Sequence, residues 1–154
     1  EGDSASCAEL FALLSSLSGV PLRQGIAVTG ALNQHGEVLP VGGVNEKIEG
    51  WFRVCDAAGL DGTQGVLLPQ RNLRHLMLDR AVVDAVAQGR FHIHTASHVG
   101  EGLALLSGMF SGITDDAAGP YPIDSLLGRC EQTLKAYREA CRQAMADTKA
   151  SWRP

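Results

Sequence analysis

Basic residues, and lysine above all, are scarce in this 154-residue chain. Thirteen residues are basic and 17 are acidic, which gives a formal net charge of −4. Proteins that bind nucleic acids usually carry a basic patch, and proteins held on anionic membranes usually carry clusters of Lys and Arg, so we expect neither kind of partner. Only three of the 13 basic residues are lysines, and the first 134 residues contain a single one, Lys47.

Other signals are absent as well. The most apolar segment, residues 10–20, is interrupted by serines and a glycine, whereas a membrane-spanning helix needs about 20 apolar residues. The four cysteines lack CxxC spacing, which favours reduced cysteines in a cytoplasmic protein. The HExxH, SxxK, GxSxG, GxGxxG and GxxxxGKS/T motifs do not occur, and with them several hydrolase and nucleotide-binding classes are excluded. The chain begins with Glu1 rather than Met, which we interpret as the start of a piece of a longer protein.

The chain does contain alternating helical and extended hydrophobic patterns. Its length suits one domain with a substantial core. The first two predicted strands would form a hairpin around the turn at residues 33–36. We predict helices over residues 6–18, 44–58, 72–78, 80–87, 98–106 and 125–151, and strands over residues 26–32, 38–41, 66–68 and 91–94.

The isolated Lys47 falls within the apolar stripe of the helix predicted over residues 44–58. At about 100° per residue, this stripe contains Val44, Ile48, Trp51, Cys55 and Ala58. A lysine that points inward loses hydration, which disfavours its charged form, and a neutral amine can act as general base for a hydroxyl nucleophile. The alternative is a lysine at the edge of the stripe that extends to solvent or pairs with a carboxylate.

Ser4 is the candidate nucleophile for such a base. It lies at or just before the first turn of the helix predicted over residues 6–18, where free N–H groups could stabilise a developing oxyanion. Its small neighbours Gly2 and Ala5 would leave space for the carbonyl group of a substrate. The alternative is that Ser4 only caps the helix, as serines commonly do.

Three motifs in order resemble the proteolytic domain of Lon proteases, over residues 1 to about 106. The form Gly-Asp-Ser-Ala-Ser is similar to the B-type, Lon-like bacterial branch of that family. The resemblance implies an α+β fold with a mixed β-sheet and packed helices, of the ribosomal-protein-S5-domain-2-like type, here without its N-terminal strands. The motifs are Gly2-Asp3-Ser4-Ala5-Ser6, Ile26-Ala27-Val28-Thr29-Gly30 and Gly36-x-Val38-Leu39-Pro40-Val41-Gly42-Gly43-x-x-Glu46-Lys47.

The same resemblance implies a serine endopeptidase with a Ser–Lys dyad. Ser4 would be the nucleophile that forms the acyl-enzyme, Lys47 its general base, and Thr29 the residue whose hydroxyl helps to hold the lysine amine. It further implies protein or peptide substrates and a hexameric ring. An AAA+ ATPase region would use ATP and Mg²⁺, but its phosphate loop is not in this chain, so we expect no cofactor here. The alternative function is a non-catalytic assembly or substrate-binding module that keeps the Lon fold.

In this interpretation the chain has three parts. Residues 1–106 form the later part of the proteolytic domain. Residues 107–124, rich in Gly, Asp and Pro, form a linker. Residues 125–154 form a C-terminal helical extension, whose narrow apolar stripe is expected to pack on the body or on a neighbouring subunit.

Three further hypotheses concern other residues. Glu1 and Asp3, if close to Lys47, would favour its charged form and hold it inactive until assembly or substrate moves them. The pattern of His92, His94 and His98 could hold zinc with a fourth ligand, but no Cys or acidic residue stands at ligand spacing, so we predict no metal site. Cys7, one helical turn from Ser4, could be a thiol nucleophile, although a small buried core residue fits better.

Overall fold

A three-stranded parallel sheet lies at the centre of the computed structural model, which describes residues 2–114 and 119–151, the last four without their side chains. Its strand order is β1-β4-β5, with Ile26 opposite Gly65 and Gly65 opposite His92. A separate antiparallel pair, β2 and β3, forms a hairpin. The strands are β1 (Ile26–Val28), β2 (Ala31–Leu32), β3 (Val38–Leu39), β4 (Gly65–Pro69) and β5 (His92–Ala96).

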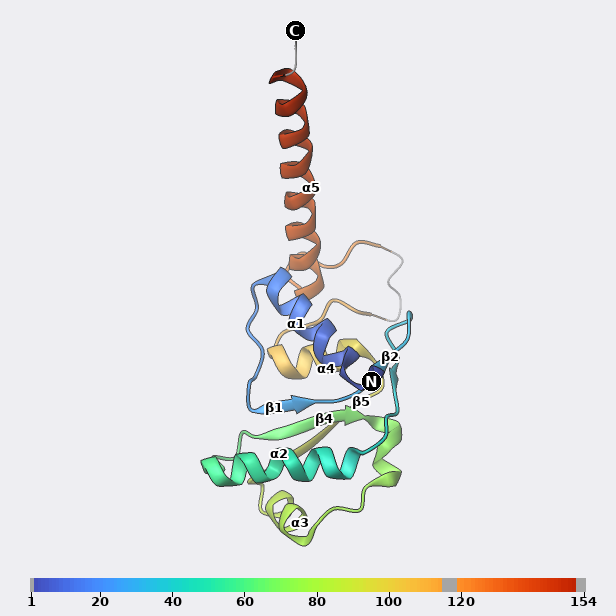
Figure 1. Cartoon of the computed structure of the whole chain (residues 1–154), viewed down its shortest axis with the longest axis vertical. Coiled ribbons are helices and arrows are strands. Elements are labelled where there is room, and N and C mark those ends of the chain that lie inside the picture. Colours follow the sequence, from blue (N-terminus) through green and yellow to red (C-terminus); the bar gives the residue numbers. More distant parts are fainter. Residues whose placement is uncertain (1, 115–118, 152–154) are drawn as a thin grey trace.

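Helices cover both faces of this sheet, and the fold is α+β, as the resemblance implies. Figure 1 shows α1 and α4 on one face and α2 and α3 on the other. The helical elements are η1 (Asp3–Ala5), α1 (Ser6–Ser18), α2 (Val44–Ala58), η2 (Gln70–His75), α3 (Arg80–Ala87), α4 (Val99–Ser107) and α5 (Leu126–Ser151).

The side chains of β4 point alternately to the two faces of the sheet, and this divides the core into two clusters. Successive side chains of a strand point to opposite faces, so Leu67 packs with Phe11 and Leu103 beneath α1 and α4. Val66 and Leu68 pack instead with residues of α2 and α3. All five residues of β4 are buried, as expected for the middle strand of a parallel sheet covered on both faces. This strand therefore holds the two halves of the fold together.

Two predictions of local structure need correction. The segment predicted as one strand over residues 26–32 is two strands, of which only β2 takes part in the hairpin. The earlier part, β1, pairs in parallel with β4 instead. The helix predicted over residues 72–78 is a 3-10 helix over Gln70–His75. Both errors have one cause: strand pairing and turn geometry depend on contacts between distant segments, which local patterns do not contain.

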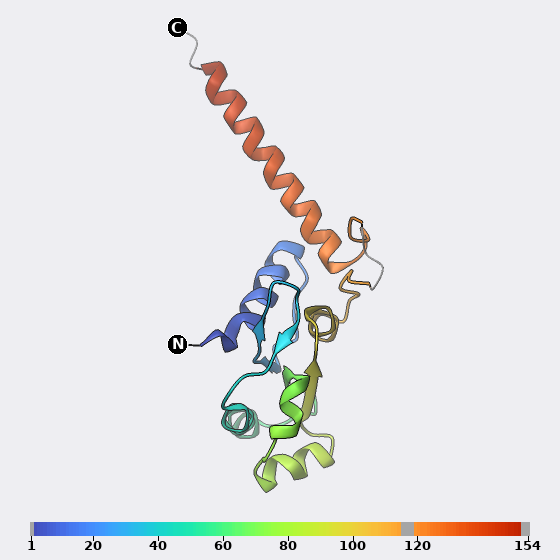
Figure 2. The same cartoon turned by 90° about the vertical axis from the view of Figure 1, so that its right-hand side faces the viewer.

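The C-terminal helix α5 leaves the body after its first turns. Near its start Cys130 is buried and its Sγ donates to the Leu14 carbonyl of α1 at 3.4 Å. Farther along, Leu134 and Tyr137 are 52% and 59% exposed, and Figure 2 shows the helix extending away from the other elements. Within residues 2–114 and 119–151, no helix is both long enough and apolar enough to cross a membrane.

Two glycines in helices provide a matched test of this packing. A Cβ on Gly102 of α4 would lie 2.5 Å from Cζ of Phe11, a ring that is itself buried, whereas a Cβ on Gly50 of α2 would meet nothing within 4 Å. We expect Gly102→Ala to lower the free energy of unfolding by about 1–2 kcal/mol, because overpacking exceeds the gain in helix propensity. Gly50→Ala should raise it by about 0.5–1 kcal/mol. Urea unfolding measures both, and changes of the same sign would contradict the packing described here.

Candidate active site

Ser4, Thr29 and Lys47 line one cleft of about 260 Å³. Ser4 lies in η1, Thr29 directly follows β1, and Lys47 is in the first turn of α2. In Figure 1, β1 points toward the side of the body where the N-terminus is marked. Because the cleft is lined by Thr29, which directly follows β1, it lies at the carboxyl ends of the parallel strands. Such ends are where α/β sheets commonly place their ligands.

Hydrogen bonds connect the three residues through Thr29. Lys47 Nζ donates to Thr29 Oγ1 at 3.2 Å, and Thr29 Oγ1 donates to the Ser4 carbonyl at 3.3 Å. The Gly30 N–H donates to the same carbonyl at 2.9 Å. The Thr29 N–H in turn donates to the Leu67 carbonyl at 3.0 Å, which extends the pairing of β1 with β4. The position of Ser4 relative to Lys47 is therefore set by the sheet.

The predicted inward orientation of Lys47 is wrong for this chain. Lys47 is exposed and lies at the edge of the buried stripe, as in the alternative interpretation of the sequence. Trp51 is half-buried, and its Nε1 donates to the Gly65 carbonyl at 2.9 Å. Because no described element covers the Lys47 side of α2, the side chain extends along the open cleft to Thr29. The buried residues of α2 are Val44, Ile48, Phe52 and Cys55.

The backbone amides of Ser6 and Cys7 are already used. The Ser6 N–H donates to the Asp3 carbonyl, and the Cys7 N–H donates to the Gly30 carbonyl at 3.1 Å. In this arrangement neither N–H is free to stabilise an oxyanion, which the sequence suggested for this helix end. A substrate carbonyl would have to find other donors or displace these bonds.

The two acidic residues near Ser4 have different outcomes. Glu1 lies outside the described residues. Asp3 is exposed, and the described part of the chain contains no ion pair between Asp3 and Lys47, since its three ion pairs all lie within single helices, α3 and α5. The idea that these acids hold Lys47 charged stays a hypothesis.

Cys7 belongs to the core. It is 2% exposed, and its Sγ approaches the Ala31 carbonyl at 3.9 Å. Burial raises the pKa of the Cys7 thiol to about 11, so almost none of it is thiolate at neutral pH. The alternative of a thiol nucleophile beside Ser4 therefore has no chemical support.

The three histidines do not converge. His92 and His94 lie on one face of β5, and their rings are stacked with the ring centroids 5.9 Å apart. His98 is the N-cap of α4, where its Nδ1 accepts from the Gly100 N–H at 3.2 Å and its Nε2 contacts the His35 carbonyl at 3.1 Å. No group of three potential metal ligands occurs among the described residues.

Sequence reasoning missed the aliphatic wall of the cleft. Ile48 and the β4 residues 66–68 are buried in the core, and they also line the space beside Ser4. Their apolar character identified them as core residues, but no local pattern shows that one side of β1 is left uncovered. The carboxyl-end position of the cleft follows only once β1 is known to pair with β4.

Comparison with known proteins shows which family this sequence resembles. The family model for the Lon protease (S16) C-terminal proteolytic domain matches residues 1–107. A Lon protease homologue of Escherichia coli (strain K12) is 51% identical over 106 residues, covering 69% of this chain and 18% of that protein. The archaeal Lon protease of Archaeoglobus fulgidus is 39% identical over 66% of this chain and 14% of its own length. Lon protease 1 of Herpetosiphon aurantiacus is 40% identical over 68% of this chain and 12% of its own length.

The matched region contains Ser4, Thr29 and Lys47, and ends where α4 ends. The chain spans less than a fifth of the length of each of these three relatives. Helix α5 lies outside the region that the family model matches. On this match, the chain belongs to the family of Lon protease C-terminal proteolytic domains.

Proposed function

We propose that this chain provides the catalytic centre of an ATP-dependent Lon-like serine protease, which hydrolyses peptide bonds with Ser4 as nucleophile and Lys47 as general base. One observation supports this proposal most: the sheet brings Ser4 and Lys47 to the same cleft, with the Thr29 hydroxyl bonded to both residues. A hydroxyl beside a positioned amine is the arrangement that nucleophilic catalysis by serine requires.

In the proposed reaction, Ser4 Oγ attacks the carbonyl carbon of the scissile amide and its proton passes to Lys47 Nζ. Collapse of the tetrahedral intermediate breaks the C–N bond, and the leaving amine takes the proton from Lys47. A water molecule then attacks the ester with Lys47 as base, which releases the acid and restores Ser4. A neutral lysine amine has two N–H groups and one lone pair. When one N–H donates to Thr29, the lone pair is available for the Ser4 proton.

Because the cleft is open, the bound substrate can influence the protonation of Lys47. The walls of the cleft are largely aliphatic, with Ala27, Ile48 and Val66 among them. A bound peptide would displace water from the exposed Lys47, and desolvation favours the neutral amine. Binding of substrate, or of a neighbouring subunit, would therefore help to create the base. The resemblance adds further proposals: protein substrates, a hexameric ring, a cytoplasmic location and an ATPase region that supplies ATP and Mg²⁺ chemistry.

Replacement of Thr29 tests the hydrogen-bonded link. We expect Thr29→Val to lower kcat/KM for cleavage of an unfolded protein by about 10- to 100-fold, because Lys47 loses the acceptor that holds its amine, and a hydrogen bond to the charged amine that forms in the reaction is worth about 1.5–3 kcal/mol. Thr29→Ser keeps the hydroxyl and should stay within about threefold of the unaltered protein. Equal losses in both variants would indicate a packing effect instead.

A non-catalytic assembly or substrate-binding module is the second candidate. The exposure of Lys47 and its bond to Thr29, rather than to the Ser4 hydroxyl, favour this alternative. Covalent labelling by a fluorophosphonate distinguishes the two functions, because only an activated serine reacts. Labelling of Ser4 that disappears in Lys47→Arg supports the peptidase, whereas substrate binding without any labelling supports the module.

A further inference from the structure

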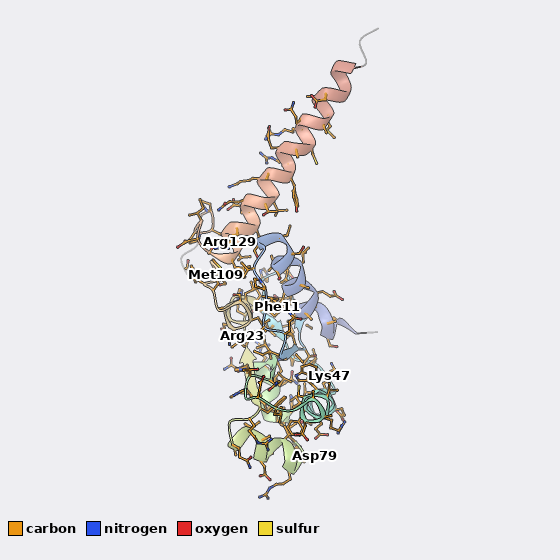
Figure 3. The ribbon with its side chains drawn as sticks, turned by 90° about the vertical axis from the view of Figure 1, so that its left-hand side faces the viewer. Phe11, Arg23, Lys47, Asp79, Met109 and Arg129 are labelled. Carbon is orange, nitrogen blue, oxygen red and sulfur yellow. The ribbon has the colours of Figure 1, made fainter. Side chains whose placement is uncertain are left out.

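A second cleft, of about 600 Å³, lies at the amino ends of the parallel strands, and we call it the Arg23 cleft. It shares no lining residue with the cleft that contains Ser4 and Lys47. Figure 3 labels Arg23 and Lys47: the first comes from the segment before β1, and the second comes from α2. The Arg23 cleft is lined by Arg23, Gln24, Gly25, Ile26, Gly62, Thr63, His92 and His94.

All the ionisable residues that line the Arg23 cleft are basic. They are Arg23, from the segment before β1, and His92 and His94, from one face of β5. No carboxylate lines the cleft. Asp61, the nearest acid in sequence to its Gly62–Thr63 wall, accepts hydrogen bonds from the Thr63 N–H at 2.9 Å and the Thr63 hydroxyl at 2.6 Å. The Oδ1 atom of Asp61 is therefore hydrogen-bonded within its own loop.

The polar groups of these basic residues are only partly satisfied by the protein. His92 Nε2 lies 2.8 Å from the Gly62 carbonyl, so this nitrogen carries the hydrogen and Nδ1 faces no described partner. In residues 2–114 and 119–151, no hydrogen bond or ion pair occupies the His94 ring or the Arg23 guanidinium, although the Arg23 backbone N–H donates to the Leu106 carbonyl at 2.9 Å. The Arg23 guanidinium and the His94 ring, which have no described hydrogen-bond partner, thus face one open space that His92 also lines.

The electrostatic state of His94 agrees with this picture. Burial, followed by the nearby charges of His92 and Arg23, holds the pKa of His94 below its ordinary value. A bound anion would offset the two charge effects and raise that pKa again. Binding of an anion and protonation of His94 should therefore strengthen each other.

We propose that the Arg23 cleft binds the phosphate group of a small molecule, with the Arg23 guanidinium as the main contact and the His94 imidazole as a further donor. Arginine binds oxyanions with two parallel N–H donors, and such charge-assisted bonds are stronger than neutral ones. The cleft is larger than a phosphate ion alone and falls in the range of small-molecule sites, about 300–1,000 Å³. This proposal does not depend on the activity of Ser4.

Inorganic phosphate is the probe for the test, added to the full chain at pH 7.5 and constant ionic strength. The five histidines provide internal controls. In two-dimensional spectra of the imidazole nitrogens, we expect the signals of His92 and His94 to shift saturably, and those of His35, His75 and His98 to stay in place. Equal shifts at all five histidines, or no saturation, would overturn the proposal.

Two charge-matched variants identify the contact. Arg23→Gln should weaken phosphate binding about tenfold, the size expected for loss of one charge-assisted hydrogen-bonded contact. Arg53→Gln removes the same charge from an exposed site on α2 and should leave the affinity unchanged. If both variants weaken binding equally, the effect is one of net charge and the site does not exist.

Sulfate isolates the role of His94, since its own charge is constant between pH 6.0 and 7.5. Lowering the pH over this range should tighten sulfate binding by about threefold or more, because His94 gains a proton and positive charge. In the variant His94→Ala this gain should vanish. Persistence of the pH effect in that variant would exclude His94 as a donor.

Discussion

Ser4→Ala is expected to lower kcat/KM for cleavage of an unfolded protein by about 10⁴-fold or more. Removal of the nucleophile from a serine peptidase leaves only the rate that binding and electrostatic groups can provide, and losses of about 10⁴ to 10⁶ are typical. Cleavage should be measured in the protein that joins this domain to the ATPase region proposed above, with the ATPase rate as a separate readout. That rate should be unchanged, because Ser4 lies in the cleft that it shares with Lys47, within the proteolytic domain.

A second serine supplies the control for this experiment. Ser16 lies on the exposed side of α1, and Ser16→Ala should leave cleavage within about twofold. Ser4 itself is half-buried, and its backbone carbonyl, which the substitution keeps, makes the bonds to Thr29 and Gly30. A stable Ser4→Ala protein that still cleaves at the normal rate would eliminate the proposed nucleophile.

Lys47→Arg is expected to lower cleavage by about 10³-fold or more, although it keeps the positive charge. The guanidinium of arginine does not lose its proton in proteins, so it cannot accept the proton of Ser4. Because Lys47 is exposed, the substitution should change the free energy of unfolding by less than about 0.5 kcal/mol. Parallel measurement of cleavage and urea unfolding separates loss of a base from loss of the fold.

The same substitution elsewhere provides a matched control. Lys135 of α5 pairs with Glu131 at 2.9 Å on the helix surface, and Lys135→Arg should leave cleavage unchanged because arginine can make that ion pair too. Wild-type activity in Lys47→Arg would show that the positive charge, and not a removable proton, is what the site needs. In that case the dyad mechanism fails even if Ser4 is essential.

Local patterns located the helices well and the strand pairing poorly. The bounds of α1, α2 and α3 agree with the predicted ranges, since helical periodicity, Gly19 and Gly59 mark them within a few residues. The parallel pairing of β1 with β4 brings together segments almost 40 residues apart. Nothing in the pattern around Ile26 distinguishes that pairing from a hairpin with the next strand.

For the site, the residues themselves suggested the chemistry. A single lysine in the first 134 residues, a serine between small neighbours and a threonine after a strand were each ambiguous. Their order and spacing carried the resemblance to the Lon family, which the family match over residues 1–107 confirms. The catalytic roles of Ser4, Thr29 and Lys47 stay predictions until the variants above are measured.

The sequence by itself determined the bounds of α1, α2 and α3 and which family the chain belongs to, because these depend on periodicity and local motifs. Only the tertiary structure decided that Lys47 is exposed at the edge of its stripe and bonded to Thr29. It alone placed Arg23 beside His92 and His94. The physical reason is the same in both cases. Whether a side chain is exposed, and which side chains meet in one cleft, depends on how distant elements pack together, and a local sequence pattern does not contain that information.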